Sequence, residues 1–280
     1  MKVYRRINFM SLDIVAGALA SSVLAARLLQ AEPGWAWWLR LAFTVWILYM
    51  GDQVLDAWKH RKKSERELHH FIFRNRRILL YAMGVIAIVD LLLIFNFMDR
   101  DFMKYALTLA GLVLLFYAMR HLFRKNRVFF IPGEVFVLVL YMAGTWLGPL
   151  VAREGEIGAP EALIALIYAA VLLMNLGVIS LYDIQLDTRL GIASLAHYMG
   201  KRTTKNLLAI TGIIVYLLSV MQFLVFGLDR YTNFALILSG MANILLLILY
   251  VPTYFRKNDY YRWTADAVLW MGFLSLLIQS

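Results

Sequence analysis

The segment ALIALIYAAVLLMNLGVISLY, residues Ala162 to Tyr182, decides the fold, because it holds 21 consecutive residues without a charge. A helix of about 20 predominantly apolar residues crosses a bilayer. Comparable uncharged runs cover Asn206–Leu228 and Tyr231–Phe255, and Val135–Ala152 is slightly shorter. Because helices satisfy every backbone polar group internally, these runs predict an all-α, polytopic membrane protein.

The composition supports a membrane protein. Of the 280 residues, 62% are hydrophobic and 16% are charged, and the mean hydropathy is +0.68. A soluble domain of ordinary composition is about half apolar. The net charge of +10 would suggest nucleic acid as the partner of a soluble protein. Here the basic residues lie in the short loops between apolar runs, so we expect no nucleic-acid partner. The absence of cysteine excludes disulfides and thiolate metal sites.

Nine transmembrane helices around a central cavity are expected. No long linker or low-complexity segment separates them, so residues 1–280 are interpreted as one domain. The predicted spans are 9–29, 35–55, 78–98, 102–123, 132–152, 161–182, 205–227, 231–252 and 262–279.

The basic residues predict the direction of these spans. With the N-terminus in the cytoplasm, 22 of the 28 Lys and Arg residues fall in inner segments and six fall in outer ones. Cytoplasmic loops of membrane proteins carry such an excess of Lys and Arg. We therefore expect a multi-pass protein with a cytoplasmic N-terminus, in a bacterial cell membrane.

Two pairs of carboxylates lie at predicted cytoplasmic helix ends. Asp52 and Asp56 occur in GDQVLDAWK, and Asp183 and Asp187 occur in YDIQLDTR. The i, i+4 spacing places each pair on one face of a helix. Carboxylates at a helix C-terminus also face the negative end of the helix dipole, so a cation is expected beside them.

Two interpretations of these pairs remain open. Neighbouring Lys and Arg side chains can form ordinary interfacial ion pairs with them. Alternatively, the pairs hold Mg²⁺, which prefers hard oxygen ligands and completes its shell with water and phosphate oxygens. In that case the site faces a diphosphate, and the apolar interior behind it takes a hydrocarbon tail.

The segment YDIQLDTRLGIASLAHYMGKR, residues 182–202, resembles the second aspartate-rich motif of the UbiA superfamily of intramembrane prenyltransferases. The motif begins with two aspartates four residues apart, and a basic residue, a glycine, an SLA-like helix start and a GKR-like turn follow. Ser180 stands where some members carry an earlier aspartate. The family has nine transmembrane helices, and its two motifs follow the second and sixth helices, as the two acidic pairs do here.

The first motif departs from the family pattern. In the best register, Asp52 replaces an asparagine, Gln53 and His60 replace aspartates, and Asp56 alone keeps its residue type. An uncharged glutamine and a histidine are weaker Mg²⁺ ligands than carboxylates. The chain is therefore interpreted as a divergent member.

The resemblance implies a Mg²⁺-dependent transfer of an isoprenyl group from its diphosphate to an aromatic or other lipophilic acceptor. Asp56, Asp183 and Asp187 are the implied catalytic residues, and they bind the metal together with Asp52 and Gln53. The candidates for diphosphate binding are Lys59, Arg61, Arg66, Arg127 and Arg189. The candidates for lining the cavity are Tyr49, Trp46, Tyr141 and Tyr182. The implied partners are the isoprenyl diphosphate, the acceptor and membrane lipid, with the active face in the cytoplasm.

Two other functions remain open. The replacements at Gln53 and His60 suit a catalytically degenerate member that binds a lipid or a protein partner. Asp90, near the middle of span 78–98, suits an ion-coupled transporter, because an acid at the bilayer midplane is costly and often functional. Asp90 can equally be hydrogen-bonded to a polar group on another helix. Glu134, near the cytoplasmic face, can join the substrate site.

Overall fold

The structure is a computed structural model, and it describes residues 10–59, 67–122, 133–190 and 194–278. Within these ranges the chain is almost entirely helical and contains no strand. The elements are α2 (Leu12–Leu28), α3 (Gly34–Lys59), α4 (Glu67–Phe97), α5 (Arg100–Leu122), α6 (Gly133–Ala152), α7 (Ala159–Leu190), α8 (Leu195–Met199), α9 (Lys201–Phe226), α10 (Arg230–Tyr250), α11 (Pro252–Phe255), η2 (Lys257–Asp259), α12 (Tyr260–Leu269) and η3 (Trp270–Leu277).

The all-α membrane class predicted from the sequence is confirmed. Each of the nine predicted spans contains helix, the last of them divided between α12 and η3. By length and composition, five helices among the described residues can cross a membrane. They are Phe71–Phe97, Gly133–Ala152, Ala159–Arg189, Lys201–Phe226 and Arg230–Tyr250. The number nine and the cytoplasmic N-terminus stay predictions.

Several helices extend beyond the predicted apolar spans into charged sequence. The first predicted inner end is residue 55, but α3 continues to Lys59, and α7 continues from the predicted end at 182 to Leu190. Helix α4 begins at Glu67, well before residue 78. Hydropathy marks the part of a helix that lies in hydrocarbon, whereas a helix can continue into the interface. Both acidic pairs therefore lie on helices rather than in loops.

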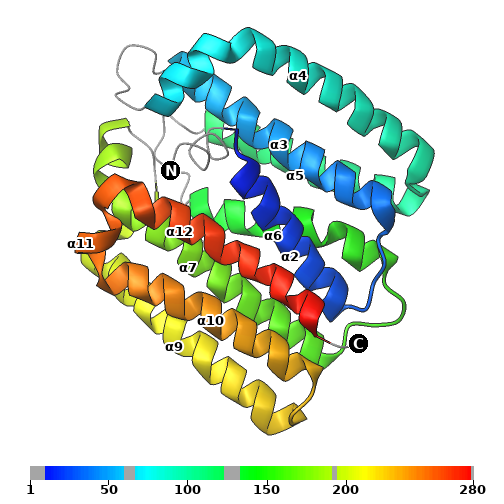
Figure 1. Cartoon of the computed structure of the whole chain (residues 1–280), viewed down its shortest axis with the longest axis vertical. Coiled ribbons are helices and arrows are strands. Elements are labelled where there is room, and N and C mark those ends of the chain that lie inside the picture. The colour runs from blue at the N-terminus through cyan, green and yellow to red at the C-terminus, as the bar shows by residue number, and fades with distance from the viewer. Residues whose placement is uncertain (1–9, 60–66, 123–132, 191–193, 279–280) are drawn as a thin grey trace.

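The helices form three groups (Figure 1). Helices α3, α4 and α5 lie on one side, α7, α9 and α10 lie on the other, and α2, α6 and α12 lie between them. The C-terminal ends of α3 and α7 and the N-terminal end of α12 lie at the same end of the bundle. This arrangement brings the two acidic motifs to one end of the molecule.

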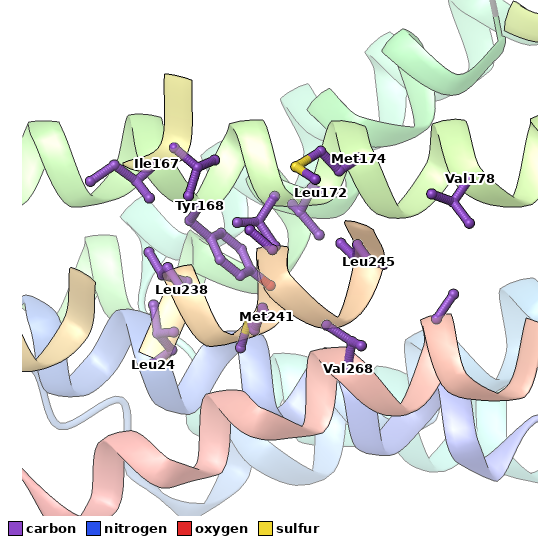
Figure 2. Packing of buried hydrophobic residues seen from close by; sticks show 14 of the residues in the cluster. Leu24, Ile167, Tyr168, Leu172, Met174, Val178, Leu238, Met241, Leu245 and Val268 are labelled. Carbon is purple, nitrogen blue, oxygen red and sulfur yellow. The ribbon is translucent and has the colours of Figure 1, made fainter. Parts of the chain in front are cut away.

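The largest buried cluster holds the α7 side of the bundle together. Tyr168, on α7, is 1% exposed and packs with side chains of α2 and α10. Figure 2 shows its ring projecting from α7 towards Met241 of α10. At the periphery, only 11% of the apolar window of α4 is buried, which suits a helix that faces lipid.

Small residues allow the central helices to approach closely. A Cβ atom on Gly272 would lie 2.5 Å from the backbone oxygen of Ala20 on α2. Ser21 and Thr145 hydrogen-bond between α2 and α6, with 2.9 Å between their hydroxyl oxygens. Small side chains and interhelical hydroxyl bonds are the usual means by which helices associate in lipid.

Candidate functional site

Asp183 is held by two consecutive residues of α12. Its Oδ1 accepts a hydrogen bond from the Tyr261 hydroxyl, 2.5 Å away, and its Oδ2 accepts one from the guanidinium Nη2 of Arg262. The side chain of Asp183 is 11% exposed and that of Arg262 is 31% exposed. The cation expected beside the second acidic pair is therefore Arg262, from the last predicted span.

Arg262 is a neighbour that several carboxylates share. Asp187, one helical turn after Asp183, lies within electrostatic reach of Arg262, Asp183 and Glu134. Asp266, one turn after Arg262 on α12, also lies within reach of Arg262, and of Asp13 on α2. The five acids Asp13, Glu134, Asp183, Asp187 and Asp266 come from helices α2, α6, α7 and α12. The single positive charge of Arg262 neutralises only part of their negative charge.

The short helix α8 is tied to the same end of α7. Ser194 caps α8 by accepting a bond from the backbone N–H of His197. Ser180 accepts a bond from the N–H of Ala196 at 3.0 Å. A serine in place of the earlier aspartate of the motif therefore serves the backbone of α8, because a hydroxyl there satisfies a buried N–H.

Glu134 joins this cluster from the first turn of α6. One carboxylate oxygen, Oε1, accepts a hydrogen bond from the N–H of Leu195 at 2.7 Å. The other, Oε2, is buried and has no hydrogen-bond partner among the described residues. An unpartnered carboxylate oxygen beside other acids has the chemistry of a cation ligand.

The first motif is only partly described. Asp52 and Asp56 lie on α3, but the side chain of Asp56 is outside the described residues. Asp52 is exposed. The Gln53 amide donates to the Ser11 hydroxyl at 2.8 Å, and its Oε1 is buried without a hydrogen-bond partner in the part of the chain that the structure describes.

The described donor set matches Mg²⁺ in chemistry. Its members are carboxylate and amide oxygens, and the buried Oε2 of Glu134 and Oε1 of Gln53 accept no hydrogen bond from any described residue. However, in the described ranges no three acidic or histidine side chains are grouped closely enough to hold a metal by themselves. Mg²⁺ commonly takes one or two carboxylates and completes its shell with water and phosphate oxygens, so the set fits that mode of binding.

The structure describes the side chain of only one of the five predicted diphosphate-binding residues. Arg61, Arg66 and Arg127 fall outside the described residues, and so does the side chain of Lys59. Arg189 lies in the last turn of α7 and is exposed.

Two of the predicted cavity tyrosines lie near each other. Tyr141 on α6 is within electrostatic reach of Tyr49 on α3, Tyr168 on α7 and Asp266 on α12. The hydroxyls of Tyr141 and Tyr168 are buried, and within the described ranges neither makes a hydrogen bond of normal geometry. Hydroxyl groups from separate helices thus meet in the interior of the bundle.

The other two predicted aromatic residues contact neighbouring helices and the N-terminal segment. The Tyr182 hydroxyl donates to the Ile248 carbonyl at 2.6 Å. The Tyr182 ring stacks on Tyr261 with centroids 4.4 Å apart. Trp46 is 8% exposed and donates to the carbonyl of Met10 at 3.0 Å. Tyr182 therefore supports the residue that holds Asp183, and Trp46 anchors the start of the described chain.

Asp90 has partners on a neighbouring helix. Its Oδ1 lies 3.2 Å from Nε of Arg40 in an ion pair, and its Oδ2 accepts a hydrogen bond from Thr44 at 3.0 Å. Arg40 also lies over the ring of Phe102. Arg40 is one of the six basic residues on the predicted outer side, but its side chain is only 8% exposed and joins α3 to α4.

Sequence reasoning missed Arg262 and Tyr261 as partners of the second motif. In the sequence, Arg262 is one of the 22 basic residues on the predicted cytoplasmic side and belongs to neither aspartate-rich motif. Its position at the start of the last span, on the side predicted to carry both acidic pairs, is the feature that could have identified it. Two pockets, of about 220 and 190 Å³, lie at the opposite end of the bundle and contain none of the predicted site residues.

No protein-family model and no curated protein matches the sequence. A solved structure does match: the apo structure of a UbiA homolog from Aeropyrum pernix K1. The two share 17% sequence identity and superpose with a TM-score of 0.59, over 94% of this chain and 97% of that chain. The resemblance inferred from the second motif is thereby confirmed at the level of the fold. The chain is an integral membrane protein of the all-α class with the fold of a UbiA homolog.

Proposed function

We propose that this protein is a Mg²⁺-dependent intramembrane prenyltransferase, which moves an isoprenyl group from its diphosphate to an aromatic or other lipophilic acceptor at the cytoplasmic face. The observation that carries the proposal is the convergence of Asp183, Asp187 and Glu134 beside Arg262 at one end of a bundle with the UbiA fold. Acidic oxygens beside a cation suit a metal–diphosphate complex, in which both signs of charge must be held.

Metal binding is assigned to acidic and amide side chains from both motifs and from α6. Asp183, Asp187 and Glu134, with Asp52, Gln53 and Asp56 of the first motif, would hold the metal. A Mg²⁺ ion held there would supply positive charge opposite the leaving diphosphate.

The chain itself supplies positioning and the exclusion of water. The hydroxyl of Tyr141, on α6, is buried and lies within electrostatic reach of Tyr49 on α3 and Tyr168 on α7. Aromatic faces stabilise a cationic carbon, and an apolar helical wall keeps water from it. The acceptor is then selected by the shape of that interior.

The experiment uses the whole protein purified in detergent. Farnesyl or geranylgeranyl diphosphate is added with Mg²⁺ and a panel of phenolic and quinone-precursor acceptors, and diphosphate release and thermal stability are measured. We expect release and a Mg²⁺-dependent stabilisation, both lost in the double variant Asp183→Asn, Asp187→Asn. Asp101→Asn is the matched control, because Asp101 is 72% exposed and pairs with Lys104 in the first turn of α5.

A degenerate member that only binds a lipid or partner is the second candidate. The hydrogen bonds from Tyr261 and Arg262 to Asp183 favour it, since a carboxylate satisfied in this way needs no metal. It predicts stabilisation by the prenyl compound that is independent of Mg²⁺, without diphosphate release. The third hypothesis, an ion-coupled transporter, gains no support from Asp90, which is engaged by Arg40 and Thr44.

A further inference from the structure

We propose that Arg262 is a diphosphate-binding residue that Asp183 holds in place until the ligand arrives, so that binding exchanges one partner of this arginine for another. The inference rests on the proposed function, because it assigns a substrate contact within the same site. The two aspartate-rich motifs do not include this residue, which lies on α12.

The geometry places Arg262 where a ligand can reach it. Its side chain is 31% exposed, whereas that of its partner Asp183 is 11% exposed. The contact with Asp183 is made through Nη2. A guanidinium carries five N–H groups in a planar fork, which suits bidentate binding of phosphate oxygens.

The surroundings position Arg262 at the acidic motif. Asp183 accepts from both Tyr261 and Arg262, and Tyr261 is in turn fixed by its stacking on Tyr182. The two residues belong to the first turn of α12, whose helix dipole adds positive potential at that end. Arg262 therefore lies beside the carboxylates of the motif in the ligand-free protein.

The charge balance explains why the exchange is favourable. Asp183, Asp187 and Asp266 all lie within electrostatic reach of Arg262. When a metal ion takes over the charge of Asp183, the guanidinium becomes available for the diphosphate that accompanies the metal. The ion pair in the free protein is then a resting arrangement that avoids leaving buried charges uncompensated.

This exchange predicts opposite effects on two ligands when the guanidinium is removed. In Arg262→Gln, inorganic diphosphate with Mg²⁺ binds at least about tenfold more weakly, because a charge-assisted contact is lost. In the same variant, Mn²⁺ alone, used as a paramagnetic substitute for Mg²⁺, binds more tightly, because the carboxylates lose their competing cation. If Arg262 had only a structural role, its replacement would weaken the binding of diphosphate and of Mn²⁺ alike.

The test measures Mn²⁺ binding by electron paramagnetic resonance and diphosphate binding by calorimetry, on detergent-purified protein that elutes as wild type does in size exclusion. Arg256→Gln is the matched control, because Arg256 is a second arginine near the same end, with its guanidinium carbon 5.9 Å from the centroid of the Tyr182 ring. Unchanged diphosphate binding in Arg262→Gln, or an equal loss in Arg256→Gln, overturns the inference.

A second variant covers the case in which Arg262→Gln does not fold. Asp183→Asn leaves Arg262 in place but removes its ion pair with Asp183. Inorganic diphosphate without metal should therefore bind this variant several-fold more tightly than wild type, and an unchanged affinity contradicts the exchange. The proposed function is judged separately by prenyl transfer. Loss of inorganic diphosphate binding in Arg262→Gln without any transfer by wild type would support the arginine site and reject the enzyme.

Discussion

Removing the charge of Asp90 should destabilise the bundle strongly without affecting the acidic site. Asp90 and Arg40 are buried, with 13% and 8% of their side chains exposed and 3.2 Å between Oδ1 and Nε. At that distance the attraction is about 5 kcal/mol for an effective dielectric constant of about 20. Asp90→Asn would also weaken the Thr44 hydrogen bond and leave Arg40 charged among apolar helices.

The expected loss in the free energy of unfolding for Asp90→Asn is about 3–5 kcal/mol, the usual cost of breaking a buried pair from one side. The double variant Arg40→Met, Asp90→Leu should lose much less, because a buried pair exchanged for apolar side chains is often nearly neutral. Thr44→Val isolates the hydrogen bond and should cost about 1.5–3 kcal/mol.

The assay is unfolding in mixed micelles by titration with sodium dodecyl sulfate, followed by tryptophan fluorescence. The chain has eight tryptophans and no cysteine, so intrinsic fluorescence is preferable to thiol-reactive dyes. Wild-type stability in Asp90→Asn, or a double variant as unstable as the single one, would refute a structural ion pair. Unchanged Mn²⁺ binding in Asp90→Asn confirms that the pair is separate from the acidic site.

Two further predictions concern helix packing and the third carboxylate. Gly272→Ala should lower the free energy of unfolding by about 1–3 kcal/mol, because its Cβ would lie 2.5 Å from the backbone oxygen of Ala20. Gly84→Ala is the control and should not lower it, because Gly84 has open space around it. Equal melting temperatures for the two variants would contradict the close approach. Glu134→Gln should weaken Mn²⁺ binding by about tenfold, because ligand charge sets affinity at such sites. The amide oxygen of the glutamine can still accept the hydrogen bond from the N–H of Leu195. If Mn²⁺ binding measured by electron paramagnetic resonance is unchanged, Glu134 is not a metal ligand.

The membrane class could be predicted from the sequence because hydrocarbon imposes a single requirement on every span. An apolar run such as residues 162–182 must be helical in lipid, whatever it packs against. The helix ends could not be predicted in the same way. The end of α7 is the example: hydropathy stops at Tyr182, but the helix continues for eight residues and carries Asp183 and Asp187.

The partners of the acidic side chains could not be predicted, because they depend on which helices become neighbours. Asp183 meets Arg262 across 79 residues of sequence, and Asp90 meets Arg40 across 50. The i, i+4 spacing shows which residues share a face of one helix, but it does not show which residues of another helix that face contacts. The sequence did predict that a cation must lie near the C-terminal end of α7, from the helix dipole, without identifying which one.

The contacts of Met10 and Ser11 with α3 affect how the protein can be handled in the laboratory. Both residues lie just before α2, and they meet Trp46 and Gln53, the latter within the first acidic motif. An affinity handle or fluorescent fusion joined directly before Met10 would therefore lie next to the first acidic motif. The Ile278 carbonyl accepts a hydrogen bond from Arg27, in the last turn of α2, so a fusion placed after Ile278 is joined at the opposite end of α2 from Met10 and Ser11.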